Sequence, residues 1–89
     1  VFMANSFTPN ADGLNDYYKP VMNCVPSEYE FTVVNRWGEI IYFTKNPMEV
    51  WDGTNQGQPC PISIYTYQLT FRFDDGNQKT QSGKINLLR

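Results

Sequence analysis

One segment of the chain, residues 64–73, alternates apolar and polar side chains with unusual regularity. Its alternating positions divide into two sets, with Tyr65, Tyr67, Leu69, Phe71 and Phe73 in one and Thr66, Gln68, Thr70 and Arg72 in the other. Because successive side chains of a strand point to opposite faces, this pattern predicts a strand with one aromatic face and one wet face. The next residues, Asp75-Gly76, tolerate positive φ and predict a two-residue hairpin. The hairpin would lead into a final strand over residues 78–88, with Ile85 and Leu87 directed inward.

Shorter runs predict the remaining strands. Residues 29–37 carry apolar side chains at alternating positions that include Trp37, which predicts a half-buried strand ending in a turn at Gly38. Residues 40–44 are apolar on both faces, so we expect this strand to lie centrally in a sheet or against a loop. With two further runs, 1–4 and 17–22, the chain has six or seven short strands and no helical periodicity. We therefore predict a single all-β domain, a small antiparallel immunoglobulin-like β-sandwich of six or seven strands.

Composition restricts the function. The 89 residues include no His, which removes the commonest general base and the commonest transition-metal ligand. No Gly-rich phosphate loop is present, and the hairpin explains the adjacent carboxylates of Asp74 and Asp75. A net charge of −2 without a basic stripe argues against nucleic acid or an anionic membrane as the partner. The longest apolar run falls far short of the ~20 residues of a membrane-spanning helix. We expect no enzymatic activity, no nucleic-acid partner and no membrane insertion.

Residues 8–16 partly match a calcium-binding loop. Aligned on Gly13, the segment offers three side-chain oxygen ligands, Asn10, Asp12 and Asp16. The first and last ligand positions of such a loop fall on Thr8 and Lys19 instead of on carboxylates. The alternative is a turn in which the Asn and Asp side chains accept backbone N–H bonds. The sequence leaves both interpretations open, so calcium is the one candidate cofactor.

Both tryptophans lie in turn-forming motifs, at residues 35–39 and 51–54. So small a chain is expected to bury its largest side chains, which favours core packing for both. The alternative is an exposed anchor for a partner, since Trp and Arg are enriched at binding hot spots. Arg36 has three candidate contacts, namely pairing with Glu39, pairing with Asp52, or covering the ring of Trp37.

These motifs, taken in order, resemble a known secretion-signal domain. Residues 7–16, 35–39 and 51–54, followed by the Tyr-rich strand and the final Leu87-Leu88-Arg89, are similar to the gliding-motility-associated, type B C-terminal domain. That family is found on proteins exported by the type IX secretion system of Bacteroidota. The resemblance covers nearly the whole chain. It implies an immunoglobulin-like fold and one sorting domain over residues 1–89, at the end of a longer exported polypeptide.

The resemblance also implies partners and a destination. The domain would be fused to a larger N-terminal cargo, often an adhesin used in gliding. The type IX outer-membrane translocon would recognise it, with help from a PorP-type outer-membrane protein. The cargo would pass through the periplasm and end on the cell surface or in the medium.

Cys24 and Cys60 lie in Pro-flanked loops. Two cysteines without His do not make a zinc site. In an exported protein their even number favours a Cys24–Cys60 disulfide, which would stabilise the fold by ~3–4 kcal/mol in the chain-entropy model. Two free thiols are the alternative.

A folded signal acts through its surface, so we expect recognition at an exposed edge strand or at loops. The last strand is the leading candidate because terminal strands readily lie at sheet edges. The expected partner-binding residues are Lys84, Ile85, Asn86, Leu87, Leu88 and Arg89. A different class of function is an extracellular adhesion module that binds glycans or calcium-dependent partners through residues 10–16 and nearby aromatics.

Overall fold

The computed structural model describes residues 3–4, 6–9, 17–22, 24–74 and 76–88. These residues form seven strands: β1 (Ser6–Phe7), β2 (Glu28–Val34), β3 (Ile40–Thr44), β4 (Thr54–Asn55), β5 (Gln58–Pro59), β6 (Ser63–Arg72) and β7 (Gln78–Leu87). Within these ranges the chain forms no helix, and so none long and apolar enough to cross a membrane. The predicted all-β class is confirmed.

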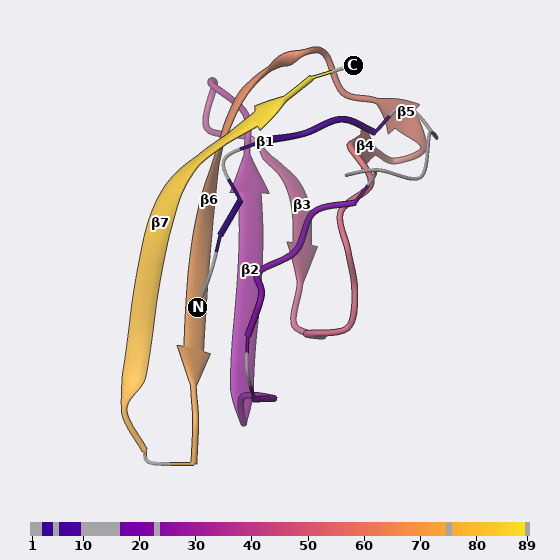
Figure 1. Cartoon of the computed structure of the whole chain (residues 1–89). Helices are drawn as coiled ribbons and strands as arrows, with labels where there is room; N and C mark the ends of the chain where they lie inside the picture. The colour runs from indigo at the N-terminus through magenta and orange to yellow at the C-terminus, as the bar shows by residue number, and fades with distance from the viewer. Residues whose placement is uncertain (1–2, 5, 10–16, 23, 75, 89) are drawn as a thin grey trace.

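Five strands form one sheet in the order β1-β7-β6-β2-β3, and β4 and β5 form a separate two-stranded sheet (Figure 1). The pairs β6–β7, β2–β6 and β2–β3 are antiparallel. The pair β1–β7 is parallel, so the main sheet is mixed. This architecture agrees with the predicted immunoglobulin-like sandwich apart from that one parallel pair.

The core lies on one face of the main sheet and consists mainly of aromatic rings. β2 and β6 place alternate side chains in it, while residues outside these strands, Phe7, Tyr18 and Trp51, pack over them. Trp51 contacts the rings of Phe7 and Tyr65 at centroid distances of 5.1 and 5.4 Å. Burial of a large apolar side chain contributes roughly 1.5–3 kcal/mol, so these few rings supply much of the fold's stability.

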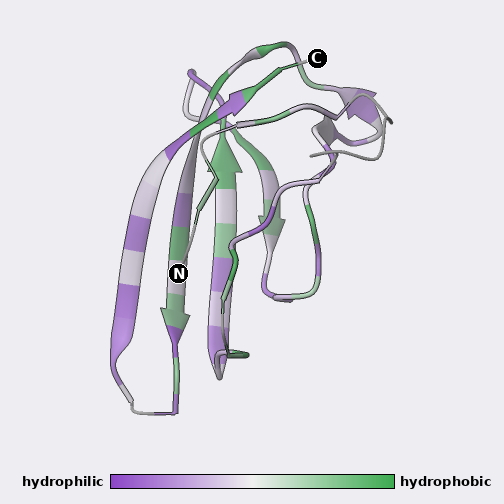
Figure 2. Ribbon diagram, in the orientation of Figure 1, coloured by the Kyte–Doolittle hydropathy of each residue, from purple (hydrophilic) through white to green (hydrophobic). Residues whose placement is uncertain are grey.

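β6 and β7 follow the predicted pattern. The core face of β6 carries the buried Tyr65, Tyr67, Leu69 and Phe71, and on β7 both Ile85 and Leu87 are fully buried. Figure 2 shows the remainder of β7 as mostly hydrophilic. The connection is longer than the expected two-residue turn. Because Arg72 pairs with Gln78, the loop consists of residues 73–77. Gly76 in this loop has a φ of 86°. Asp75 lies outside the described residues.

Other predicted strand boundaries need correction. β2 ends at Val34, so Trp37 lies beyond the strand in a turn. β3 has the predicted bounds, 40–44, but it is the outer strand of the sheet, so the first of its two expected placements, a central one, is wrong, and Ile40 is exposed to solvent. Of the two short runs, Met3 and Ala4 lie outside any strand. In the run 17–22, Tyr18 and Val21 form isolated bridges instead of a strand, and Tyr18 pairs with Trp51.

Candidate functional site

The outer edge of β7 is the first candidate surface, because four of the six expected partner-binding residues, 84–87, lie on this strand. Ser6 and Phe7 of β1 pair with Asn86 and Leu87, and the Leu88 N–H donates to the Phe7 carbonyl oxygen at 2.9 Å. The expectation of an unpaired edge at the end of β7 is therefore corrected. β1 covers this end because burial of the Phe7 ring brings the N-terminal segment against it.

Among the described residues, no strand pairs with the outer edge of β7 before Asn86. Because the N–H groups of successive residues in a strand point to opposite sides, each N–H group of β7 can be assigned either to the β6 side or to the outer edge. Since the Leu88 N–H points to β1, and β6 lies on the other side of β7, the even-numbered residues direct their N–H groups to the outer edge. The register between β6 and β7 runs without a shift from Gln78 to Leu87, so this alternation is unbroken. Thr80, Ser82 and Lys84 therefore present outward backbone donors.

The six expected partner-binding residues have different environments. Ile85 and Leu87 are fully buried, which excludes their side chains from contact with a partner. Lys84 and Leu88 are exposed, and Asn86 is half-buried. Arg89 lies outside the described residues. The edge that remains open is thus Gln78–Ile85, upstream of most of the predicted set.

The turn between β2 and β3 is a second candidate surface. The Asn35 side chain holds it: its Oδ1 accepts the N–H groups of Trp37 and Glu39 at 2.9 and 3.0 Å, and its Nδ2 donates to the Glu39 carboxylate at 2.9 Å. Gly38 completes the turn with a φ of 81°. This turn places Trp37 in solvent, with 74% of its surface exposed. The expectation that Trp37 packs in the core is wrong because the side-chain bonds of Asn35 end the strand first.

Arg36 takes one of its three predicted contacts. Its guanidinium lies over the Trp37 ring, 5.1 Å from the centroid. Within the described part of the chain, the ion pairs are Lys45–Glu30 and Arg72–Glu28, and neither involves Arg36. Glu39 bonds Asn35 instead.

A hollow of about 710 Å³ lies beside this turn. Trp37 and Arg36 line it together with Ile62 and with Gln56 at the tip of the β4–β5 hairpin. Gln56 and Gly57 have φ values of 54° and 83°, the pattern of a type I′ turn, in which a residue other than Gly, Asn or Asp is unfavourable. Neither this hairpin nor the hollow was predicted from the sequence, although Gly57 within an Asn-Gln-Gly-Gln run is a signal for the turn.

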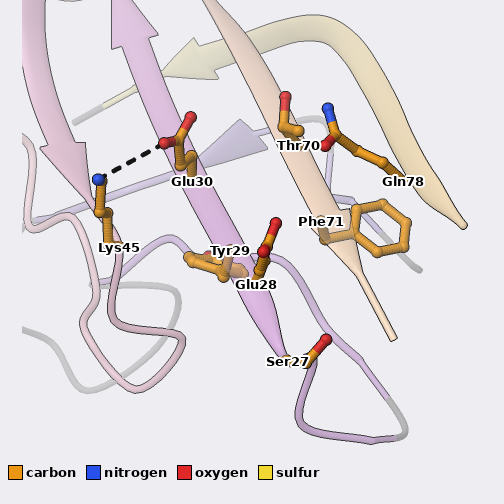
Figure 3. Close-up of a pocket in the computed structure, with 8 residues that line it drawn as sticks. All are labelled: Ser27, Glu28, Tyr29, Glu30, Lys45, Thr70, Phe71 and Gln78. Atoms are coloured by element: carbon orange, nitrogen blue, oxygen red, sulfur yellow. Dashed lines mark ion pairs between the residues drawn. The ribbon is translucent and has the colours of Figure 1, made fainter. Parts of the chain in front are cut away.

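A smaller hollow of about 360 Å³ holds two carboxylates, Glu28 and Glu30 (Figure 3). Each is already paired: Lys45 Nζ lies 3.7 Å from Glu30 Oε1, and Arg72 binds Glu28. All four side chains are substantially exposed, and such surface pairs contribute little to stability. They are adequately explained as surface ion pairs and give no indication of acid–base catalysis.

The Trp51-Asp52-Gly53 motif is structural. The Trp51 side chain is fully buried, as expected, and its Nε1–H donates to the Thr54 carbonyl at 3.0 Å. Asp52 Oδ1 accepts the Thr54 N–H at 3.1 Å, which forms an Asx turn within this turn-forming motif. Gly53 has a φ of 83°, and a Cβ there would lie 2.8 Å from Pro9 Cγ. The motif therefore fits against the N-terminal segment.

Cys24 and Cys60 are not joined by a disulfide. Cys24 is exposed and lines a hollow near the start of β2, where Tyr29 also lines it. Cys60 is buried and lines the hollow beside the Arg36–Trp37 turn, where Asn35 also lines it, just beyond the end of β2. A strand segment of this length spans about 20 Å, and a disulfide needs Cα atoms within about 7 Å. The structure differs here from the expected bridge, since the fold places the two loops at opposite ends of β2.

The predicted calcium ligands Asn10, Asp12 and Asp16 lie outside the described residues. Within the described ranges, no three His, Cys, Asp or Glu side chains are grouped so as to hold a metal ion. The groups with shifted pKa values belong to the core. Burial raises the pKa of Tyr18 and of Tyr29 above the usual value, with smaller contributions from Tyr67 and Tyr42 respectively.

The chain matches a known protein family over nearly its whole length. Residues 1–87 match the family model described as the CHU_C type IX secretion signal domain. No curated protein matches the sequence.

Proposed function

The chain belongs to the type IX secretion signal domain family, and we propose that it is the C-terminal sorting signal of a longer exported protein. Membership implies fusion to a cargo, recognition by type IX machinery and export to the cell surface or extracellular space. The family match over residues 1–87 is the observation that carries the proposal.

The finer features of the proposal follow the resemblance noted in the sequence. The domain is of type B and occupies residues 1–89 as one unit. A cargo such as a gliding adhesin of a member of the Bacteroidota precedes it and crosses the inner membrane by the general route. A PorP-type outer-membrane protein assists the translocon. The domain itself is a noncatalytic recognition element.

The open edge of β7 supports one mode of recognition. Its outward N–H groups at Thr80, Ser82 and Lys84 provide a template to which a partner adds a strand. In this mode, some of residues 84–89 do not contact the partner themselves. Ile85 and Leu87 instead hold the strand in place by packing in the core. Deletion of residues 84–89 would remove that anchor and unfold the signal.

A reporter fusion tests the function. The domain is attached to a periplasm-directed protein in cells that have the type IX system, and export moves the reporter to the surface or the medium. Retention of a folded fusion in the periplasm would refute the proposal. The adhesion-module alternative depends on residues 10–16, outside the described ranges, and no comparison supports it.

Ser82→Pro tests the edge in the same assay. It removes an outward donor and leaves the N–H groups that face β6 in place. Ser82→Ala is the matched control, because it changes the side chain and keeps the backbone donor. Loss of export in Ser82→Pro alone, with the folded state intact by circular dichroism, is the expected result. Equal export of both variants would exclude strand addition at this position.

A further inference from the structure

The Arg36–Trp37 turn is unusual because it holds a large apolar side chain in water. Trp37 is 74% exposed, and three hydrogen bonds of the Asn35 side chain fix the turn beneath it. Exposure of an indole forgoes the stabilisation that burial provides in a chain this small. Since the turn is rigid, a partner that binds this ring loses little conformational freedom in ordering it.

The surroundings of the ring indicate the chemistry of that partner. Ile62, 60% exposed, lies in the same hollow as Trp37, together with the exposed Pro59 and Pro61. Arg36 is the one charged side chain among the described residues that line this hollow, and it has no ion pair there. The surface therefore combines exposed apolar side chains with neutral polar ones, such as Asn55, Gln56 and Gln58, and a single positive charge, in a chain whose net charge is −2.

We propose that the Arg36–Trp37 turn and its hollow bind a protein of the outer-membrane type IX machinery through a segment that carries a carboxylate beside an apolar side chain. The apolar side chain packs on Trp37 and Ile62 within the hollow, and the carboxylate pairs with Arg36. This inference rests on the proposed function and names a contact surface separate from the β7 edge.

A protein segment fits this surface better than a carbohydrate. The guanidinium of Arg36 already lies over the Trp37 ring, so one ring face is not open for stacking against a sugar. Trp and Arg together are the residues most enriched at protein–protein hot spots, and an Arg paired with a carboxylate in a desolvated interface gives strong, oriented binding.

The test measures export of the reporter fusion as the ratio of reporter outside the cell to reporter in the periplasm. Trp37→Ala and Arg36→Glu are each expected to lower this ratio at least about tenfold, the effect of losing a hot-spot residue. Met48→Ala and Lys19→Glu are the matched controls. Both residues are exposed and line a different hollow, near the start of β2, so the controls should export normally.

The outcomes separate the two claims. If the unaltered fusion stays in the periplasm, the proposed function fails. If the unaltered fusion is exported and both turn variants are exported equally well, only the inference about the turn is overturned. Trp37→Ala is expected to melt within a few degrees of the unaltered domain, because surface substitutions away from packed features change stability little. A purified variant that melts normally but is not exported supports a binding role.

A photoreactive residue at Ile62 identifies the occupant in exporting cells. The expected adduct is a protease-sensitive cross-link whose partner peptides come from an outer-membrane protein of the secretion machinery, and Trp37→Ala should abolish it. A protease-resistant adduct that periodate destroys would assign the hollow to a carbohydrate and overturn the proposal. A cross-link to a second copy of the domain, or no adduct while export proceeds, would also overturn it.

Discussion

Tyr18 and Trp51 are joined by reciprocal backbone hydrogen bonds, each N–H donating to the carbonyl oxygen of the other at 2.8 Å. The Tyr18 hydroxyl also donates to the Ala4 carbonyl at 2.7 Å. This bridge ties the N-terminal segment to the loop before β4, over the aromatic face of β2 and β6. Two segments far apart in the sequence thereby close the core.

Trp51→Ala is expected to destabilise the domain by about 3–5 kcal/mol, the usual cost of truncating a buried Trp. Urea denaturation followed by circular dichroism measures the change. Trp37→Ala is the matched control and should change the free energy of unfolding by less than about 0.5 kcal/mol, because that ring is exposed. Similar losses from both substitutions would contradict the assignment of one Trp to the core and one to the surface.

Stability should fall as the pH rises above about 10, the ordinary tyrosine pKa. Burial raises the pKa of Tyr18 and Tyr29, so above this pH the unfolded chain releases protons that the folded chain retains, which favours unfolding. Below that pH the phenols are protonated in both states and make no difference. Melting temperatures between pH 8 and 11 measure the effect. Tyr29→Phe should reduce the slope of melting temperature against pH, and an unchanged slope would show that Tyr29 is not a cause of the loss.

Gly83→Ala is expected to destabilise the fold by about 1–3 kcal/mol, in the range of overpacking substitutions. A Cβ at Gly83 would lie 2.8 Å from Tyr67 Cε2, on the core face of the β6–β7 pair. Ser82→Ala, on the opposite face, is the neutral comparison. In a Tyr67→Ala background the cost of Gly83→Ala should largely disappear. If Gly83→Ala destabilised the Tyr67→Ala protein as much as it destabilises the unaltered protein, the Tyr67 ring would not be the source of the strain.

The two cysteines should react at different rates. Cys24 is exposed and should alkylate in the folded protein, whereas Cys60 is 5% exposed and should alkylate only on unfolding. Intact mass after alkylation of periplasm-matured protein, with and without prior reduction, measures this. Alkylation of neither thiol until a reductant is added would instead establish the Cys24–Cys60 disulfide expected from the sequence.

The long strands were predictable because a sheet with one buried face imposes strict alternation. Tyr65, Tyr67 and Ile85 all lie inward as that alternation requires. Features that depend on pairing between distant segments were not predictable. β1 has two residues and is a strand only because Phe7 reaches the end of β7, and no local pattern encodes that contact.

The candidate surfaces were predicted less completely than the core. Alternation alone extends β2 to Trp37, whereas the side-chain hydrogen bonds of Asn35 end the strand and leave the ring in water. The open part of the β7 edge also lies upstream of most of the residues expected from the sequence, because β1 covers Asn86 and Leu87. Both differences arise from specific contacts that hydrophobic periodicity does not record.

The central claim, that this domain is an export signal, is tested most directly by the location of a fused reporter in two strains. One strain has the type IX system, and the other is isogenic but lacks the outer-membrane translocon. The account predicts reporter on the surface or in the medium of the first strain and only in the periplasm of the second. Periplasmic reporter in both strains, or external reporter in both, would contradict it.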